Sequence, residues 1–411
     1  MAATHPLPAR RALAGAFAAL MVVPLAAGCA QTVAGSSATA KSGDGAGGSS
    51  PSSTPTPVSK VKVTSNVEGA AGKVAVNRMV KLDTAKGTFR TVSVRTQKGD
   101  RVAGALNNRR TSWHAKSRLE PGMSYVVHAV AADSRGIPKK YDARFATQDL
   151  TLDQQTFASV SPLDGRTVGV GMPVMIHFDV PVTNHKLFQQ HMHVTTSSGQ
   201  KGSFYWLDDQ NVHYRPKTFW KPGSKVNVAI DVNSLDAGSG VYGQKSRNVS
   251  FTVGRSMVSK VDMKADLLRT YRDGRLIKTI PVTGGKSGFT TRSGTKVIVQ
   301  KYRHKRMNSE TIGIDPNSAN GYDLSDVEYA MRLTFSGEFL HAAPWSVGSQ
   351  GHANVSHGCT GMSTANAQWL YDNSIVGDPV VYTGTDKYMT LTNGYGDWNL
   401  SWADWQKGSA L

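Results

Sequence analysis

The residues with the clearest chemistry lie in the tetrapeptide 356–359 (Ser-His-Gly-Cys), which follows His341 by 15 residues. The chain has two cysteines, and the other one, Cys29, lies at the end of an apolar N-terminal run. Cys359 is therefore not expected to form a structural disulfide within the folded region. A thiol reacts well when a base or a positive dipole stabilises its thiolate, and His341 and His357 are candidate bases. The tetrapeptide predicts a cysteine nucleophile.

Gly358 adds a second chemical feature to this loop. A glycine lets the backbone approach a substrate closely, and successive N–H groups at such a position can converge on a developing oxyanion. Two other interpretations stay open, an inert buried thiol and a zinc site formed by His341, His352, His357 and Cys359. Closed structural zinc sites generally use more than one cysteine, so the nucleophile is favoured and no metal is expected.

Several segments together resemble a known family. Residues 341–345 (His-Ala-Ala-Pro-Trp), 351–352 (Gly-His) and 356–359 closely resemble the signature of the L,D-transpeptidases, which cross-link peptidoglycan. The similarity is to lipid-anchored mycobacterial-type members with two immunoglobulin-like domains and a YkuD-type catalytic domain. It runs from about Ser59 to the C-terminus. Further similar segments are 204–206, 219–223, 320–322 and 396–399.

The resemblance implies a reaction and roles in it. Cys359 would attack the carbonyl of the third residue of a tetrapeptide stem, release D-Ala and pass the acyl group to an amine of a second stem, forming a 3→3 cross-link without a cofactor. His341 would be the base, oriented by a main-chain carbonyl beside Ala342. The N–H groups of Gly358 and Cys359, assisted by the Tyr322 hydroxyl, would form the oxyanion hole.

The resemblance also suggests which residues contact the substrate. These are Tyr322, Ser356, Trp345, His352 and Met307. Trp345 could equally be a core residue, and Met307 is expected to pack within a lid. His357 would hold the loop or donate to the substrate, with a local structural hydrogen bond as the alternative.

Two positions depart from the family pattern. Ala342 stands where relatives often have Ser, which is tolerable if only the backbone carbonyl matters. Gly361 stands where many relatives have Arg or Asn, so any side-chain contact with the donor from that position is absent.

The function retains alternatives at this stage. Transfer of the acyl group to water would make the protein an L,D-carboxypeptidase, and loss of reactivity would make it a non-catalytic wall-binding lipoprotein of the same fold. A zinc hydrolase is the third alternative. The resemblance predicts β-lactams of the carbapenem class as inhibitors.

The N-terminus predicts export and anchoring. Arg10 and Arg11 precede an apolar run at 12–28 that is short for a membrane span, and Cys29 follows it. This pattern predicts a lipoprotein signal peptide at 1–28 and lipidation of Cys29. Ala26 departs from the preferred lipobox, so an ordinary signal peptide is the alternative.

Composition supports a location outside the cytoplasm. Residues 29–58 are mostly small and polar and are expected to form an unfolded linker that reaches from the membrane's outer face toward the wall. The formal net charge is +18, which favours attraction to anionic wall polymers. A nucleic-acid partner is not expected for an exported chain. The charges are dispersed, so a solvated surface explains most of them equally well.

The elements that position the site are expected to be mainly β. Alternating stretches at 125–130 and 225–230 are typical of sandwich strands, and Pro-Gly pairs at 121–122 and 222–223 recur at the spacing of an immunoglobulin-like domain. The predicted parts are immunoglobulin-like domains at 59–149 and 150–254, a β-rich catalytic domain with a short helix at 255–383, and a packing tail at 384–411.

Within the catalytic region, Asp273-Gly274 predicts a tight hairpin turn between strands at 267–271 and 275–280. Another strand is expected at 295–299. The polar stretch 302–326 has few strand signals and predicts an irregular lid that carries Met307 and Tyr322.

The last part of the chain contains a helix signal and three tryptophans. Ser363 is expected to cap a short helix that includes Trp369, and residues 377–382 are expected to return as a strand. Three tail residues are expected to pack on the preceding sandwich rather than bind sugar: Trp398, Trp402 and Trp405.

Overall fold

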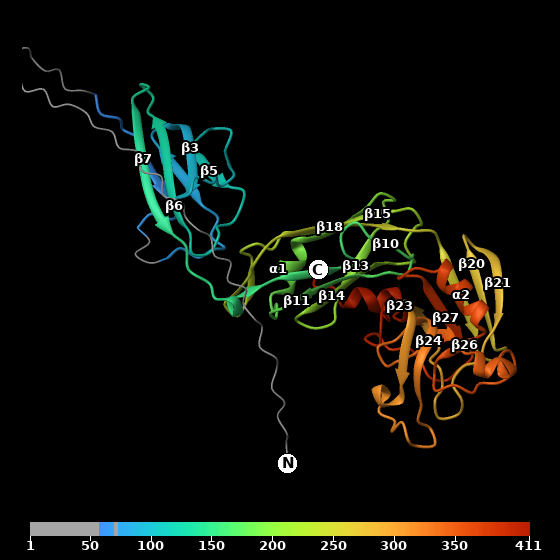
Figure 1. Cartoon of the computed structure of the whole chain (residues 1–411). Coiled ribbons are helices and arrows are strands. Elements are labelled where there is room, and N and C mark those ends of the chain that lie inside the picture. The colour runs from blue at the N-terminus through green and yellow to red at the C-terminus, as the bar shows by residue number, and fades with distance from the viewer. Residues whose placement is uncertain (1–56, 70–72) are drawn as a thin grey trace, which may run out of the picture. The chain divides into compact units, whose positions relative to one another are not determined.

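The computed structural model describes residues 57–69 and 73–411. The predicted signal peptide, Cys29 and nearly all of the predicted linker lie outside these residues. In the part that is described, no helix is both long and apolar enough to cross a membrane. Most of the regular structure is strand, and Figure 1 shows the order of the elements along the chain.

The first immunoglobulin-like sandwich consists of two antiparallel sheets. One sheet has the order β1-β2-β5-β4 and the other β3-β6-β7. The strands are β1 Lys62–Ser65, β2 Lys81–Ala85, β3 Thr88–Thr96, β4 Gly104–Leu106, β5 Ser112–Ala115, β6 Ser124–Ala132 and β7 Pro138–Ala146. Alternate residues of β6 are buried, as the alternating sequence predicts. All seven strands fall within the predicted range 59–149.

The second sandwich is built from two four-stranded sheets, β10-β18-β15-β12, in which β10 pairs parallel with β18, and β13-β14-β11-β9. A small sheet of β16, β17 and β8 adjoins them. The elements are η1 Leu152–Gln154, β8 Gln155–Thr156, β9 Ala158–Ser161, β10 Thr167–Val168, β11 Val174–Phe178, α1 His185–Gln190, β12 Met192–Thr196, β13 Gly202–Trp206, β14 Asn211–Pro216, β15 Lys225–Ile230, β16 Asp236–Gly238, β17 Val241–Gly243 and β18 Arg247–Val253.

The third region carries two sheets. Their orders are β21-β20-β19-β27-β22 and β23-β24-β25-β26. Its elements are β19 Met257–Asp262, β20 Leu267–Arg272, β21 Arg275–Pro281, β22 Gly294–Val297, β23 Gln300–Asn308, η2 Ser309–Ile312, β24 Asp323–Arg332, β25 Phe339–Ala342, η3 Pro344–Ser349, β26 Thr360–Met362, α2 Thr364–Asn373 and β27 Pro379–Thr383. The helix α2 packs on β24 and β25. The sequence-based prediction of two immunoglobulin-like sandwiches followed by a β-rich domain is confirmed.

The hairpin of β20 and β21 forms where the turn signal predicted it. Asp273 and Gly274 have φ values of 50° and 82°, the left-handed conformation that a tight two-residue turn requires. Ser363 caps α2 as expected, because its hydroxyl accepts a hydrogen bond from the Asn366 N–H. The predicted strand before the tail is β27.

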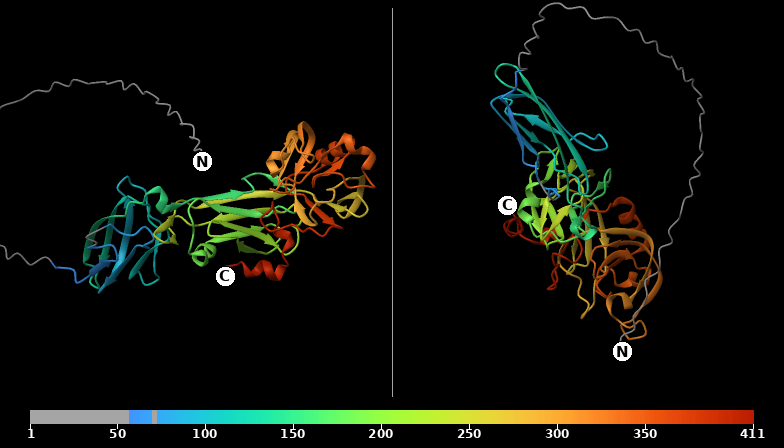
Figure 2. Two further views of the ribbon diagram at one scale, coloured as in Figure 1. Left: turned by 90° about the horizontal axis from the view of Figure 1, so that it is seen from below. Right: turned by 90° about the vertical axis from the view of Figure 1, so that its left-hand side faces the viewer.

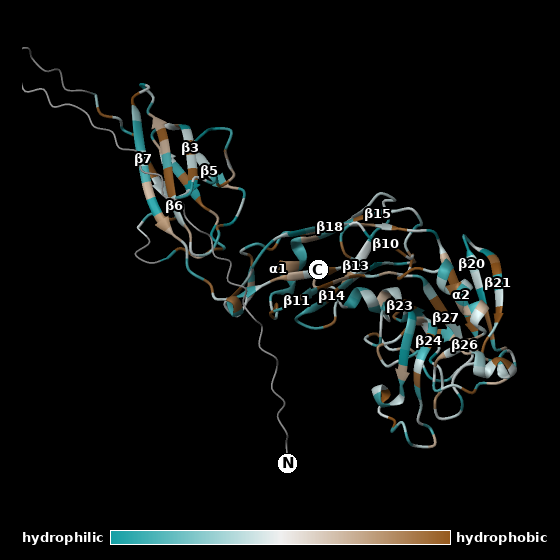
Figure 3. Cartoon of the chain, in the orientation of Figure 1, coloured by the Kyte–Doolittle hydropathy of each residue, from teal (hydrophilic) through white to brown (hydrophobic). Residues whose placement is uncertain are grey.

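The prediction of an irregular lid over 302–326 is wrong at its two ends. Residues 302–308 and 323–326 belong to β23 and β24, which pair as an antiparallel ribbon, whereas residues 309–322 lie outside the strands. The strand β23 is hydrophilic along most of its length (Figure 3). A prediction that searches for alternating apolar residues therefore does not detect it. The basic side chains of β23 instead lie against acidic side chains of β24: Arg303 with Glu328, His304 with Asp326 and Arg306 with Asp323.

The C-terminal tail packs on the second sandwich, as expected from its tryptophans. It contains η4 Asp397–Asn399 and α3 Trp402–Lys407. The indole N–H of Trp398 donates to the Gly171 carbonyl at 2.7 Å, and that of Trp405 donates to the Ser203 carbonyl at 2.9 Å. Both views of Figure 2 show this segment beside strands of the second sandwich.

A buried arginine completes this contact. The guanidinium of Arg215 lies 5.0 Å from the ring centre of Trp398, 5.5 Å from that of Trp402 and 4.6 Å from that of Trp405. The tail also reaches the catalytic region, where the Asn399 side chain hydrogen-bonds both the N–H and the carbonyl of Thr295 at 2.8 Å. The tail thereby joins the second sandwich to the strand β22.

Candidate active site

Two neighbouring strands bring the predicted nucleophile and base together. β25 and β26 run parallel with His341 opposite Gly361, and Cys359 lies immediately before β26. Both side chains line a cavity of about 320 Å³. Other predicted site residues line the same cavity: Met307, Tyr322, Trp345, Ser356 and His357.

The Cys359 side chain is held as a neutral thiol. Burial raises its pKa to about 12, against the opposing effect of a hydrogen bond from the Phe339 N–H. The sulfur donates to the Gly337 carbonyl at 3.5 Å. A thiol with this pKa stays protonated at neutral pH, so reaction requires removal of its proton during attack.

His341 is in the state that can remove this proton. Its Nδ1 lies 2.8 Å from the Ala342 carbonyl, and a carbonyl can only accept, so Nδ1 carries the hydrogen. The lone pair is therefore on Nε2. Burial lowers the pKa of His341, which keeps the ring neutral. This contact uses the backbone of Ala342, so the departure from Ser at this position leaves it intact.

The loop that carries the nucleophile is held by its own serine. The Ser356 hydroxyl accepts from the Gly358 N–H at 3.0 Å and donates to the Cys359 carbonyl at 2.6 Å. Gly358 has φ = 117°, a conformation that favours glycine. The structure therefore differs from two expectations. The Gly358 N–H is bonded within the loop rather than directed at an oxyanion, and the Ser356 hydroxyl is engaged there rather than with a substrate.

His357 makes aromatic contacts instead of the local hydrogen bond considered as an alternative. Its ring lies edge-on to Phe289 at 4.7 Å and tilted against Tyr322 at 5.1 Å between ring centres. Its buried Nε2 has no hydrogen-bond partner among the described residues. Burial, reinforced by the positive charge of Lys286, lowers the pKa of His357. A neutral ring with a free nitrogen can accept from, or donate to, a bound substrate.

Met307 of β23 and Tyr322, which directly precedes β24, form one wall of the cavity. Met307 is 9% exposed and packs with Tyr322, which agrees with its expected packing role. Burial, followed by the proximity of Cys359, raises the pKa of Tyr322 to about 12, so its hydroxyl remains a hydrogen-bond donor.

Trp345 and His352 lie in different surroundings. Trp345 is 58% exposed and its ring stacks over His341 at 5.9 Å between centres, so it is a rim residue rather than a core residue. His352 is exposed and does not line the cavity. The expectation that His352 contacts the substrate is not supported by this placement.

The space around Gly361 explains its small size. A Cβ built there would lie 2.9 Å from the Ala343 Cβ and 3.2 Å from the Thr283 Cγ2. A side chain at this position would therefore collide with Ala343 and Thr283. Gly361 lines the cavity through its backbone alone.

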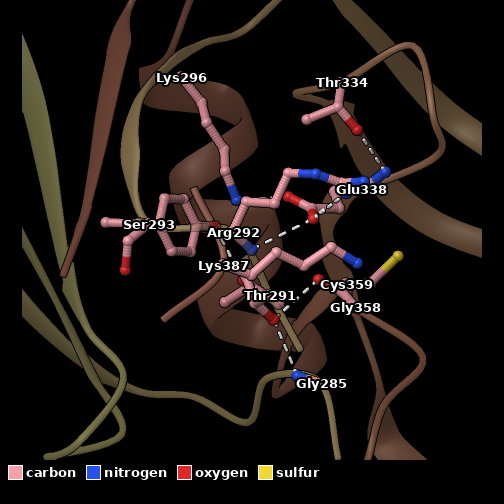
Figure 4. A network of polar contacts seen from close by, with 12 residues as sticks. Gly285, Thr291, Arg292, Ser293, Lys296, Thr334, Glu338, Gly358, Cys359 and Lys387 are labelled. Atoms are coloured by element: carbon pink, nitrogen blue, oxygen red, sulfur yellow. Dashed lines mark hydrogen bonds and ion pairs between the residues drawn. The ribbon is translucent and has the colours of Figure 1, made fainter. Parts of the chain in front are cut away.

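A buried ionic network beneath the nucleophile was missed by sequence reasoning. Figure 4 shows the Glu338 carboxylate between Arg292 and Lys296, beside the loop of Gly358 and Cys359. Lys296 has no exposed surface, and its ammonium also lies 3.7 Å from the centre of the Tyr382 ring. Burial lowers the pKa of Lys296, and the charge of Glu338 opposes that effect.

The geometry disfavours the zinc alternative. Across residues 57–69 and 73–411, no group of three or more His, Cys, Asp or Glu side chains is arranged to hold a metal ion. His352 does not line the cavity, and His341 already uses one ring nitrogen to bond Ala342. The arrangement instead combines a thiol, a neutral imidazole and backbone donors. These are the nucleophile, the base and the oxyanion donors that acyl transfer requires.

Comparisons with known proteins identify the family. Residues 71–236 match the bacterial Ig domain family, and residues 256–381 match the L,D-transpeptidase catalytic domain family. The L,D-transpeptidase 2 of Mycobacterium tuberculosis is 35% identical over 355 residues, which cover 85% of each chain. The chain belongs to the L,D-transpeptidase family.

Two further relatives of this L,D-transpeptidase each match a little more than half of it. The L,D-transpeptidase 1 of Mycobacterium tuberculosis is 37% identical over 227 residues, covering 55% of this chain and 84% of that protein. The solved structure of the L,D-transpeptidase LdtMt1 in complex with imipenem is 35% identical, with a TM-score of 0.49, covering 56% of this chain and 99% of that one. The protein is an L,D-transpeptidase, and the cavity around Cys359 is its candidate active site.

Proposed function

We propose that this L,D-transpeptidase forms 3→3 cross-links in peptidoglycan through an acyl-enzyme on Cys359. The observation that carries the proposal is the pairing of a partly buried neutral thiol with a buried neutral imidazole in one cavity. A tetrapeptide stem is the donor, and its terminal D-Ala is the leaving group. An amine on the side chain of a second stem is the acceptor.

The two half-reactions follow from the transfer of one proton to and from His341. As the Cys359 sulfur attacks the donor carbonyl, its proton passes to Nε2 of His341. The imidazolium then gives that proton to the departing D-Ala amine as the carbon–nitrogen bond breaks. In the second half-reaction, His341 takes a proton from the attacking amine and returns it to the thiolate as the thioester is cleaved. The Ala342 carbonyl holds the same tautomer throughout.

The developing oxyanion requires donors that are free of other partners. The Gly358 N–H is bonded to Ser356. The Cys359 N–H and the Tyr322 hydroxyl therefore act as the donors, and the high pKa of Tyr322 keeps its hydroxyl protonated. Trp345 and Met307 supply apolar walls for the stem on either side.

Incubation of the purified protein with a disaccharide-tetrapeptide tests this function. Mass spectrometry is expected to detect a dimer that has lost one D-Ala, together with an acyl-enzyme. A disaccharide-tripeptide, which lacks the leaving group, is the control and should give neither product. Tripeptide without dimer would identify the L,D-carboxypeptidase alternative, in which water is the acceptor. An unchanged tetrapeptide with folded protein would support the non-catalytic wall-binding alternative.

The same site chemistry supports carbapenems as inhibitors. A strained β-lactam carbonyl needs only a nucleophile, a base and an oxyanion donor at the place where a stem carbonyl would lie. The product is a thioester between the opened ring and Cys359. Such an ester persists when water cannot be activated at its carbonyl.

The pH dependence of acylation follows from the neutral states of the Cys359 thiol and the His341 imidazole. We expect the rate of acylation by a carbapenem to be constant from neutral to mildly alkaline pH and to fall only below about pH 6.5. Protonation of His341, whose pKa burial lowers, removes the base, whereas the thiol pKa of about 12 gives no titration in the neutral range. Stopped-flow measurement from about pH 5 to about pH 9.5 checks this profile. A step near pH 8.5, the value of an ordinary thiol, would contradict it.

The location is also part of this proposal. A signal peptide at 1–28, lipidation of Cys29 and the linker to residue 58 would anchor the enzyme to the outer face of the membrane. The two immunoglobulin-like domains would then carry the catalytic domain toward the wall, where stem peptides are found. The net charge of +18 supports contact with anionic wall polymers.

A further inference from the structure

The carbonyl of Gly358, directly before the nucleophile, is bonded to a residue outside the cavity. The Thr291 hydroxyl donates to this carbonyl at 2.9 Å and accepts from the Gly285 N–H at 2.8 Å. Thr291 is 1% exposed and is absent from the residues that line the cavity. Figure 4 shows both contacts behind the loop.

The hydrogen bond determines where the next N–H group points. A trans peptide is planar, so the carbonyl of Gly358 and the N–H of Cys359 point in opposite directions. With the carbonyl bonded to Thr291 behind the loop, the Cys359 N–H is directed to the opposite side, where the Cys359 side chain lines the cavity. Since Ser356 takes the neighbouring Gly358 N–H, the Cys359 N–H is the backbone donor that this loop has left for an oxyanion.

Thr291 is itself held in place. Its carbonyl accepts from the Thr385 hydroxyl at 2.8 Å. The next residue, Arg292, bonds to Glu338 through both its backbone N–H and its guanidinium. The stem of Glu338 in turn lies against the loop, because its Cγ is 3.7 Å from the position of a Cβ on Gly358. The peptide is thus confined by a hydroxyl and by an anchored side chain.

We propose that Thr291 is a positioning residue that orients the Cys359 N–H as an oxyanion donor. The inference rests on the acyl transfer proposed above, in which charge develops on the carbonyl oxygen of the donor. A donor that is already aimed at this oxygen requires no reorganisation when the charge forms. The threonine touches neither substrate nor sulfur and acts through the peptide between Gly358 and Cys359.

Thr291→Val removes the hydroxyl while keeping the shape of the side chain. We expect it to lower the carbapenem acylation rate by about 10- to 100-fold, because removal of one oxyanion donor typically costs 100- to 1,000-fold and here the donor is misdirected rather than lost. Thr291→Ser keeps the hydroxyl and should recover most of the rate. Thr270→Val is the matched control, since Thr270 is an equally buried threonine of the same domain whose hydroxyl bonds Ser259 instead of Gly358.

A second reagent separates this role from a general disturbance of the loop. Iodoacetamide alkylates the thiol by displacement at a saturated carbon, so no oxyanion forms. Thr291→Val should therefore be alkylated at the wild-type rate while its acylation is slow. Thermal unfolding of each variant checks that the fold is intact.

The outcomes distinguish the inference from the function on which it rests. Equal acylation of Thr291→Val and wild type would reject the inference alone. A parallel loss of acylation and alkylation would also reject it, because the threonine would then maintain the loop as a whole. A wild-type protein that takes no acyl group at all would reject the proposed function together with the inference.

Discussion

Treatment of the wild-type protein with a carbapenem is expected to add the mass of one drug molecule, and Cys359→Ala is expected to take none. Cys359 is the only free thiol that the described residues contain, and it lines the cavity with the base. Replacement by Ala removes the nucleophile and adds no bulk, so the loop held by Ser356 should persist. Intact-mass spectrometry measures the adduct, and peptide mapping should place it on the segment that contains Cys359.

Cys359→Ser weakens the nucleophile while it keeps the shape of the site. A serine hydroxyl has nearly the same volume as the thiol but is a weaker nucleophile, so it should acylate far more slowly. The unfolding temperatures of both variants should stay close to that of the wild type. An adduct on Cys359→Ala, or cross-linking by that variant, would show that another group reacts.

His341→Ala is expected to slow acylation by about 10² to 10⁴, whereas His357→Ala should slow it much less. His341 has its Nδ1 hydrogen bonded to the Ala342 carbonyl and presents a lone pair on Nε2, which is the state of a base. His357 is held between Phe289 and Tyr322 and contributes shape and one free nitrogen. The measurement is the single-turnover acylation rate with a carbapenem under identical conditions.

The buried position of His341 requires a control for folding. His341→Gln nearly preserves the volume of the ring and lacks a useful base, so it should be as slow as His341→Ala without leaving a cavity. Rescue of His341→Ala by added imidazole would support the loss of a proton acceptor. Similar acylation rates for the wild type and His341→Ala would refute this division of roles between the two histidines.

Local signals in the sequence were the reliable ones. The turn at Asp273 and Gly274 was predictable because both residues tolerate positive φ, and the cap at Ser363 because its hydroxyl bonds a nearby N–H. The nucleophile and the base stay predictions, made because few residue types can perform that chemistry, and the structure places both in one cavity. The turn and the cap depend on neighbours within a few positions along the chain.

Features that depend on distant partners were not predictable. The strand β23 pairs with β24 and lays polar side chains against acidic ones there, so its own sequence looked like a polar loop. No local sequence signal marks Thr291 as important. Its hydroxyl bonds the Gly358 carbonyl, which lies 67 positions further along the chain, and only the fold brings the two together. His352 was expected at the substrate site because it matches a residue of the site wall in the resembled family, but it is exposed and does not line the cavity.

The burial of Arg215 under three tryptophans has a consequence for the order of biosynthesis. Arg215 leaves the ribosome well before the tail, and its guanidinium meets Trp398, Trp402 and Trp405 only after about 180 further residues. At usual elongation rates this interval is roughly 10 to 40 s. During that time the second sandwich exposes a charged and apolar face that only the chain's last residues can cover. Its maturation therefore waits for the complete translation of the enzyme that follows it.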